Sequence, residues 1–577
     1  MTNKLQYRTL FFLILAVFNV FADDLRTANQ IDYTNYFLAD IRDAEECSMD
    51  YVDGKFVFSD LISNPSITCP DMFSWKLFMQ SIDDRFWSRW ADEFQNWPSE
   101  PYQLCSEGGT PGVNCCQPGA SNNPKGHCPV FPGNQHKAQL LKLDKASNKT
   151  GEAQALKEEV IRVGIPSIVE HAAGFNVDLN ALSNRFKASK SISMALPECS
   201  QSVIDTLVPK TYESIGRVIR QTNAEVTVRD EVFHNYLFEN NLYNATGVMN
   251  VFNRNAKNLK MTIEGVNFSN APYHIKNRSA NRKNPNAHLA SVDLPSKSIM
   301  IKSNWIHKNL AKMLNMKVDS ANPYISKTLQ TTINIPGTDH QCAWRGEHYL
   351  VAFHISSKDI PQWVWTTFEH VYLPGRCDIT GCNDSYGYKS PDKLPKGVFD
   401  NFVTPHQKSD HLNNPSIVFN RDLLYKVEQA RSQLTDILKK VGIGTGESTS
   451  VHEPDAHDKG WLSYRLKGSQ VEFTDLMGRR TLLGNSVTEA GFMDGSSCVT
   501  CHARAGINIS DGKPNFFKLS VFDLRLSDYG YAKSVDGIPN QDWFHNSDMP
   551  PSLDVLQTDF IWGFLFAKEI VHTGKGE

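Results

Sequence analysis

Five residues near the C-terminal end of the chain, Cys498 to His502, read Cys-Val-Thr-Cys-His. This CxxCH pattern is the attachment signature of c-type heme: the two thiols add to the vinyl groups of the porphyrin, and the adjacent imidazole becomes the proximal ligand of the iron. The alternatives are a disulfide or half of a zinc site. A four-ligand zinc site would need a second close pair of Cys or His downstream, and the sequence has none. We therefore predict one covalently bound heme c, held by Cys498, Cys501 and His502.

The first 22 residues have the pattern of an export signal. Lys4 and Arg8 precede an apolar run at 10–18, and the small residue Ala22 follows where a signal peptidase would cut. The run is short for a membrane span, and no later stretch has the length of a bilayer-crossing helix. Because heme is attached to CxxCH outside the bacterial cytoplasm, both ends of the chain indicate the same compartment. We expect a signal peptide at 1–22 and a soluble periplasmic protein without a membrane span.

Charge and composition narrow the class of partner. The formal net charge is −4, and loss of the signal, with its two positive charges and no negative one, changes it to −4 − 2 = −6. This balance argues against nucleic acid as a partner. The apolar and charged fractions are those of an ordinary globular protein, and the length predicts about two to four domains.

The remaining cysteines predict disulfides. Twelve cysteines, less the two of the heme motif, leave ten, an even number that favours up to five bridges in an oxidising compartment. The sequence leaves their connectivity open. We interpret the adjacent Cys115 and Cys116 as parts of two separate structural bridges rather than as a redox-active or metal-binding pair. Candidates to close short segments are Cys47 with Cys69, Cys377 with Cys382, and the four residues Cys105, Cys115, Cys116 and Cys128 within a Gly- and Pro-rich loop near 104–135.

Periodicity predicts helices in the first part of the chain. Within the segment Phe73 to Trp97, large aromatic residues recur at helical spacing, and Pro98 ends the run. Core packing is a better explanation of this stripe than an electron relay. The charged segment 137–163 is also helical in pattern. The aromatic stripe consists of Trp87, Trp90, Phe94 and Trp97.

From about residue 200 to 373 the pattern becomes that of short strands. The runs 348–355 and 362–370 indicate an antiparallel pair. Alternation along the second run places Trp363, Trp365, Thr367 and Glu369 on one face and Val364, Thr366, Phe368 and His370 on the other. His354 and His370 could join Glu369 in a metal or acid–base site, although histidines satisfied within the core are the better interpretation.

A Pro-, Asn- and Lys-rich loop at 381–414 and a helix at 420–441 precede the Gly-rich segment 442–446. We place a domain boundary there. The expected organisation is a mixed, partly β-rich region at 23–446, whose role is open, followed by a mostly helical cytochrome c-like heme domain at 447–577. The fold class is therefore α+β.

A small monoheme domain needs a helix leading into CxxCH, a distal ligand and a closing helix. Segments 486–493 and 553–568 have the patterns for the two helices. Between them, Pro550 holds Met549 extended, which suits a thioether presented to the iron from a loop. Met549 is the preferred sixth ligand; His545 comes next, and an open or water-bound iron is the third alternative.

Three islands of the sequence resemble a family of exported bacterial proteins. These islands are residues 350–354, residues 361–370, and the stretch from Gly484 and Asn485 to Cys-Val-Thr-Cys-His-Ala at 498–503. The family is known generically as cytochrome c family proteins. The resemblance implies one covalent heme and electron transfer, and it carries over to Cys498, Cys501 and His502. The assignment of Met549 as a ligand is based only on the residues around it and not on the resemblance.

The sequence thus predicts a monoheme c-type cytochrome that exchanges single electrons with a redox partner protein. The alternative is a heme enzyme of the peroxidase or oxygenase type, with an open sixth iron position and a small-molecule substrate bound between the two regions. A single CxxCH argues against a two-heme peroxidase. A third reading, a sensory module that contains heme, would show spectral change on ligand binding without turnover.

Overall fold

The computed structural model describes residue 43 and the ranges 46–105, 110–134, 163–164, 196–212, 215–261, 278–281, 284–289, 292–338, 340–373, 424–446, 453–474, 478, 480–490, 496–510, 513–515, 538–539, 543–546 and 552–571 of the 577-residue chain. The predicted signal peptide, the predicted helix at 137–163 except its last residue, the loop at 381–414, Cys377 with Cys382, and Met549 lie outside these residues. Val163 itself belongs to a short strand, so the predicted helix does not extend to it.

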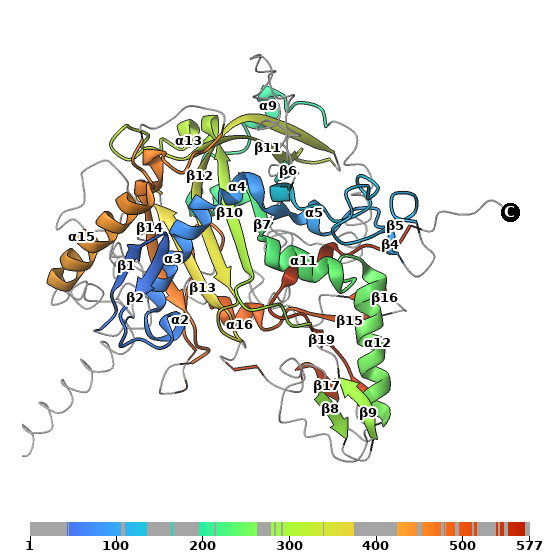
Figure 1. The fold of residues 1–577 in the computed structure, drawn as a ribbon. Helices are drawn as coiled ribbons and strands as arrows, with labels where there is room; N and C mark the ends of the chain where they lie inside the picture. Colours follow the sequence, from blue (N-terminus) through green and yellow to red (C-terminus); the bar gives the residue numbers. More distant parts are fainter. Residues whose placement is uncertain are drawn as a thin grey trace, which may run out of the picture.

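An eight-stranded sheet forms the centre of the described structure (Figure 1). Six strands lie in the order β14 (Tyr464–Gln470), β13 (Val364–His370), β12 (Gln341–Ser357), β10 (Ile299–His307), β7 (Ala224–Arg229) and β3 (Ala91–Asp92). Outside this path, β11 (Ser326–Asn334) pairs with β12, and β6 (Val163–Gly164) pairs with β11. All pairings in the sheet are antiparallel except that of β6 with β11. The predicted pair at 348–355 and 362–370 is confirmed as part of β12 and β13.

Helices and short strands surround the sheet, and their mixture confirms the α+β class. The helices are α2 (Pro65–Thr68), α3 (Pro70–Asp83), α4 (Phe86–Arg89), α5 (Glu93–Asn96), α9 (Gln201–Ile204), α10 (Ile215–Thr222), α11 (Glu231–Glu239), α12 (Ala245–Met261), α13 (Lys308–Met313), α15 (Leu424–Val441) and α16 (Cys498–His502), with 3-10 turns η5 (Lys459–Ser463) and η8 (Trp562–Phe566). The short strands pair as β1 (Met49–Val52) with β2 (Lys55–Phe58), β4 (Gln103–Leu104) with β5 (Cys115–Cys116), β8 (Arg278–Asn281) with β9 (Asn284–Leu289), β17 (His545–Asn546) with β18 (Ser552–Leu553), and β15 (Gly506–Ser510) with both β16 (Lys513–Asn515) and β19 (Leu556–Gln557). In the described part of the chain, no helix combines the length and the apolar character that crossing a membrane requires.

The two faces of the sheet bury different sets of side chains. On one face, the rings of Phe353 and Phe368 stack with centroids 5.2 Å apart and pack against Phe78 of α3. On the other face, Trp365 belongs to the cluster that contains Val499 of α16. The Cys-Val-Thr-Cys-His motif therefore lies on the side of the sheet opposite the aromatic core of α3.

The prediction of one continuous helix from Phe73 to Trp97 is wrong, because the segment is divided into several short elements. Arg85 adopts a left-handed backbone with φ of 53°, and this break separates α3 from α4. The tryptophans of the stripe are nevertheless buried: Trp87, Trp90 and Trp97 are 5%, 2% and 1% exposed. Core packing of these tryptophans is thus confirmed: Trp87 and Trp90 belong to one hydrophobic cluster and Trp97 to a second one.

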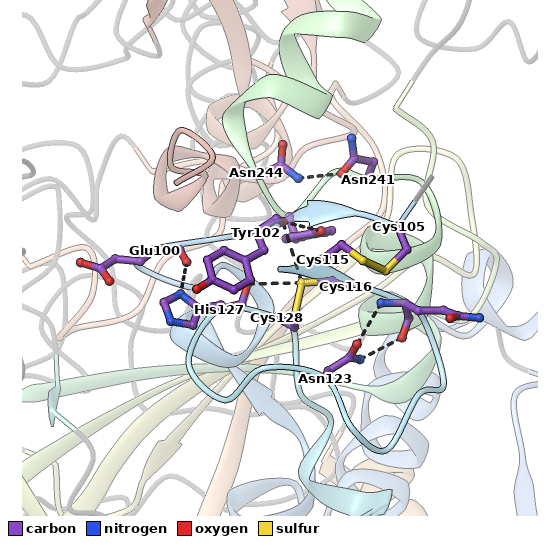
Figure 2. Close-up of a disulfide and its surroundings, with 12 residues drawn as sticks. Glu100, Tyr102, Cys105, Cys115, Cys116, Asn123, His127, Cys128, Asn241 and Asn244 are labelled. Carbon is purple, nitrogen blue, oxygen red and sulfur yellow. Dashed lines mark hydrogen bonds between the residues drawn. A yellow bond between two sulfur atoms is a disulfide. The ribbon is translucent and has the colours of Figure 1, made fainter. Parts of the chain in front are cut away.

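The Cys-rich segment is a loop held by disulfides, as predicted (Figure 2). The adjacent Cys115 and Cys116 form β5 and take part in two separate bridges, which confirms their structural interpretation. The pairing of Cys47 with Cys69 is also confirmed. The four disulfides of the described residues are Cys47–Cys69, Cys105–Cys115, Cys116–Cys128 and Cys199–Cys342.

The predicted closing helix at 553–568 is wrong. That segment contains β18, β19 and η8, and its backbone has positive φ angles at Asp559 and Phe560. Polar side chains within the segment are buried: Thr558 is 1% exposed and Asp559 is 4% exposed. The entry segment is also different, because the described residues 486–490 form turns. Within the described part of 447–577, α16 is the one α-helix, so a mostly helical fold does not hold there.

The sheet extends across residue 446, where the sequence suggested a division into domains. β14 belongs to the C-terminal part, and its residues 464–470 pair with β13. The helix predicted at 420–441 is confirmed as α15. Two backbone hydrogen bonds end it, from Gly442 N to Lys439 O and from Ile443 N to Leu438 O, with Gly442 at a φ of 89°.

We predict that Gly216→Ala destabilises the protein, because a Cβ atom at this position of α10 would lie 2.1 Å from the carbonyl oxygen of Ser486. Alanine is normally about 1 kcal/mol better than glycine within a helix. Overpacking should reverse this preference and lower the free energy of unfolding by about 1–3 kcal/mol in urea denaturation. The control is Gln221→Ala on the exposed side of the same helix, expected within about 0.5 kcal/mol of wild type. Equal stability of wild type and Gly216→Ala would contradict the close approach.

Candidate functional site

The Cys-Val-Thr-Cys-His motif forms the short helix α16, and a glutamine from the sheet supports its first turn. Gln470, the last residue of β14, accepts a hydrogen bond from Val499 N at 3.0 Å through Oε1. Its Nε2 donates to Ser497 Oγ at 3.0 Å and to Thr481 Oγ1 at 2.6 Å. A buried amide with these partners satisfies one of the backbone donors that a helix start leaves open. The end of the sheet therefore holds the start of the motif.

Neither cysteine of the motif forms a disulfide, whereas the other eight described cysteines all do. Cys498 Sγ donates to the carbonyl oxygen of Leu483 at 3.6 Å. Burial raises the pKa of the Cys498 thiol well above its ordinary value, and nearby Glu489 and Cys501 raise it further. Both side chains are thus available as thiols, the form from which thioether bonds to heme are made.

His502 is held in one orientation by a backbone carbonyl and an aromatic ring. Its Nδ1 lies 2.8 Å from the carbonyl oxygen of Phe560. A carbonyl only accepts, so Nδ1 carries the proton and Nε2 keeps its lone pair. The ring centroid lies 4.3 Å from that of Trp365. Burial lowers the pKa of His502 to about 4, which keeps the imidazole neutral at pH 7. A neutral imidazole with Nδ1–H donated to the backbone is the form that binds a metal through Nε2.

The face of β13 toward the motif carries residues that alternation placed together. Asn485 Nδ2 donates to Thr367 Oγ1 at 3.0 Å, and Ser486 N donates to Glu369 Oε1 at 2.7 Å. His370 lies on the opposite face, where its ring stacks on Tyr324 with centroids 3.6 Å apart. Glu369 and His370 therefore point away from each other, and a site that combines them is excluded. The core interpretation of His370 is confirmed.

A cluster of partly buried titratable side chains beside the motif was not predicted from the sequence. Lys302 Nζ lies 3.0 Å from Glu225 Oε1, and His354 Nε2 lies 3.6 Å from Glu489 Oε1. Burial raises the pKa of Glu489 to about 7 and lowers that of His354 to about 3. Burial opposes the charge of Lys302, but Glu225 outweighs it and the pKa is raised. One feature of the sequence could have indicated this cluster: the charged residue Lys302 follows the apolar run 299–301 within a predicted strand.

The two candidates for the sixth ligand are placed differently. Met549 lies outside the described residues. His545 is in β17, where the backbone pairs it with Leu553 of β18. The identity of the sixth ligand stays a prediction.

The residues present fit a covalent heme. Two cysteines that form no disulfide precede an imidazole whose Nε2 keeps its lone pair, and all three residues lie on the short helix α16. Among the described residues, no group of three or more His, Cys, Asp and Glu side chains is arranged to hold a metal ion. Heme iron does not need such a group of side chains, because the porphyrin supplies four of its ligands.

Comparison of the chain with protein-family models, with curated proteins and with solved structures gives no match.

We predict that the raised pKa of Glu489 makes stability depend on pH. Its ordinary pKa is 4.5 and its value in the folded protein is about 7, so the folded state binds the extra proton between these values. Stability should therefore fall as the pH rises through this window, by up to about 3 kcal/mol. Glu489→Gln removes the titrating group, so its free energy of unfolding relative to wild type should increase between pH 5 and pH 8 on the order of a few kcal/mol.

Urea denaturation at several pH values measures this difference. The control is the exposed Glu472→Gln, which should follow the wild-type profile. A constant difference between Glu489→Gln and wild type across the range would show that the carboxyl group titrates normally.

Proposed function

We propose that the chain is an exported c-type heme protein that transfers single electrons to or from a partner protein. The observation that carries the proposal is the state of the motif: Cys498 and Cys501 stay out of the disulfides that the other described cysteines form, and His502 Nδ1 donates to Phe560 O. A disulfide interpretation of CxxCH would require the two thiols to be bonded to each other. Heme would supply a one-electron couple at the iron.

The residues of the chain would each have a distinct role. Cys498 and Cys501 would hold the porphyrin through thioether bonds, and His502 would bind the iron through Nε2. Trp365 restricts rotation of the His502 ring, and Gln470 fixes the start of the helix that carries all three. A ligand held from two sides changes little in geometry when the oxidation state changes, which favours rapid electron transfer.

The disulfides support an oxidising compartment, and we propose the periplasm as that compartment. Four bridges join described cysteines, including Cys199 to Cys342 over a sequence separation of 143 residues. Such bonds persist in secreted and periplasmic proteins and are rare in the cytosol. The same compartment is where heme is attached to CxxCH motifs, so the location and the cofactor support each other.

We predict that periplasmic expression with a cytochrome c maturation system yields one covalent heme per chain. The pyridine hemochrome assay and the intact mass measure attachment. Replacing both thiols, Cys498→Ala with Cys501→Ala, should abolish it, because no thioether can form. The matched control is Cys199→Ala with Cys342→Ala, which removes two cysteines of a disulfide and should leave attachment intact. Wild-type protein without bound heme after maturation would refute the proposal.

We predict that Met549→Ala abolishes the weak red charge-transfer band that sulfur ligation adds to the spectrum of ferric heme. The reason is that Met549 is the preferred sixth ligand, and alanine leaves the iron five-coordinate or water-bound. His545→Ala is the control and should keep the band. If the wild type is instead high-spin and binds carbon monoxide readily, the iron is open, and the heme enzyme with a small-molecule substrate replaces the electron carrier.

A further inference from the structure

We infer that Lys358 is a positioning residue for the proposed heme ligand His502, acting through Asp559 and the carbonyl group of Phe560. The inference rests on the proposed function and says what the sheet contributes to that site. Lys358 directly follows β12, and Asp559 lies 201 residues later in the chain. The contact therefore joins the sheet to the segment that faces His502.

The turn that accepts the hydrogen bond from His502 has an unfavourable backbone conformation. Asp559 has a φ of 49° and Phe560 a φ of 67°, both in the left-handed region. Residues other than glycine avoid this region, and two in succession persist only where the surroundings determine the conformation. This conformation directs the carbonyl oxygen of Phe560 to within 2.8 Å of His502 Nδ1. The strain thus lies at the group that orients the imidazole.

Asp559 is the residue through which the surroundings hold this turn. Its Oδ1 accepts hydrogen bonds from Lys358 Nζ and, at 3.3 Å, from Trp363 Nε1. Its Oδ2 accepts from Leu294 N at 2.6 Å, and its own N–H donates to Gln557 Oε1 at 2.7 Å. The side chain is 4% exposed, so the carboxylate depends on these partners rather than on water. Of its partners, Lys358 alone brings a full positive charge.

Lys358 is itself fixed in the sheet region. It is 8% exposed, its Nζ donates to Pro361 O at 3.0 Å, and its backbone N–H donates to Ser298 O at 2.9 Å. Two further left-handed residues adjoin it: Lys297, whose N–H donates to Lys358 O, and Trp363, whose ring lies 5.8 Å from Nζ. Including Asp559 and Phe560, this junction contains four of the eight non-glycine residues with positive φ in the described structure. Lys358 Nζ also lies 3.5 Å from Asp293 Oδ1, so it pairs with two carboxylates. The concentration of strain around this lysine points to positioning rather than to a chance surface contact.

Loss of the Lys358 cation should change the ligand bond of His502. Asp559 would then be buried without a counter-charge, so it would take up a proton or the turn would move. Either response weakens the hydrogen bond from His502 Nδ1 to Phe560 O. A weaker bond makes the imidazole a poorer electron donor to the iron, which favours the ferrous state. The midpoint potential should therefore rise.

The experiment compares wild type with Lys358→Met, which keeps a long apolar side chain and removes the charge. The readouts are the midpoint potential and the ¹⁵N NMR shifts of His502, assigned by the loss of signals in His502→Gln. We expect a higher potential and a shift of the Nδ1 signal in Lys358→Met. The matched control is Lys327→Met, which removes a buried lysine from β11 that lies beside Trp87, not beside Asp559. It should alter neither readout.

The outcomes separate the inference from the proposed function. If Lys358→Met does not fold, the double variant Lys358→Met with Asp559→Asn removes both charges together and should show the same two changes. Wild-type potential and His502 shifts in a folded Lys358→Met, or in the double variant, would overturn the inference. If wild type attaches no heme, the proposed function fails, and the His502 shifts alone decide: a wild-type Nδ1–H signal that is unchanged in Lys358→Met rejects the positioning role, and a changed one supports it.

Discussion

The contact between β13 and the segment that carries the Cys-Val-Thr-Cys-His motif is the constraint on which the site depends. β13 is buried on both faces, so each polar side chain along it needs a partner from the protein. Thr367 and Glu369 find partners in Asn485 and Ser486, and Trp365 lies against His502. Separating the two surfaces would leave buried donors and acceptors unsatisfied. The sheet and the motif therefore form one structural unit.

This dependence gives the long N-terminal region a role in the site. The ring contact to His502 comes from Trp365, which lies 137 residues earlier in the chain. Such a separation adds to the loop-closure entropy only weakly. β14 continues the same sheet and ends in Gln470, which caps the motif helix. One of the two groups that orient the imidazole, the Trp365 ring, thus comes from an interior strand of the sheet, and the strand at its edge holds the start of the helix.

The sequence correctly predicted those elements whose structure is determined by residues close together in the chain. The alternation along β13, the helix α15 that ends at Gly442, and the bridge from Cys47 to Cys69 follow from neighbours close in the chain. The closing helix failed because Asp559 binds Lys358 and Leu294, partners that lie more than 200 residues away. The spacing of apolar residues carries no information about such partners. A polar residue that is buried against distant partners cannot be distinguished, from the sequence, from one that faces water. The break of α3 at Arg85 was missed for a similar reason, since nothing in that residue type favours a left-handed backbone.

The two faces of the sheet carry different kinds of side chain, stacked aromatic rings on one and charged groups on the other. One face buries stacked rings such as Phe353 and Phe368, whose removal from water contributes directly to the free energy of folding. The face toward the motif carries Lys302 paired with Glu225, and Lys358 pairs with Asp559 at its margin. Ion pairs that are wholly or partly removed from water add little stability, because the loss of hydration offsets their attraction, and apolar residues of equal volume would serve the fold as well. The stability of the fold therefore does not explain why charged groups are concentrated beside the Cys-Val-Thr-Cys-His motif.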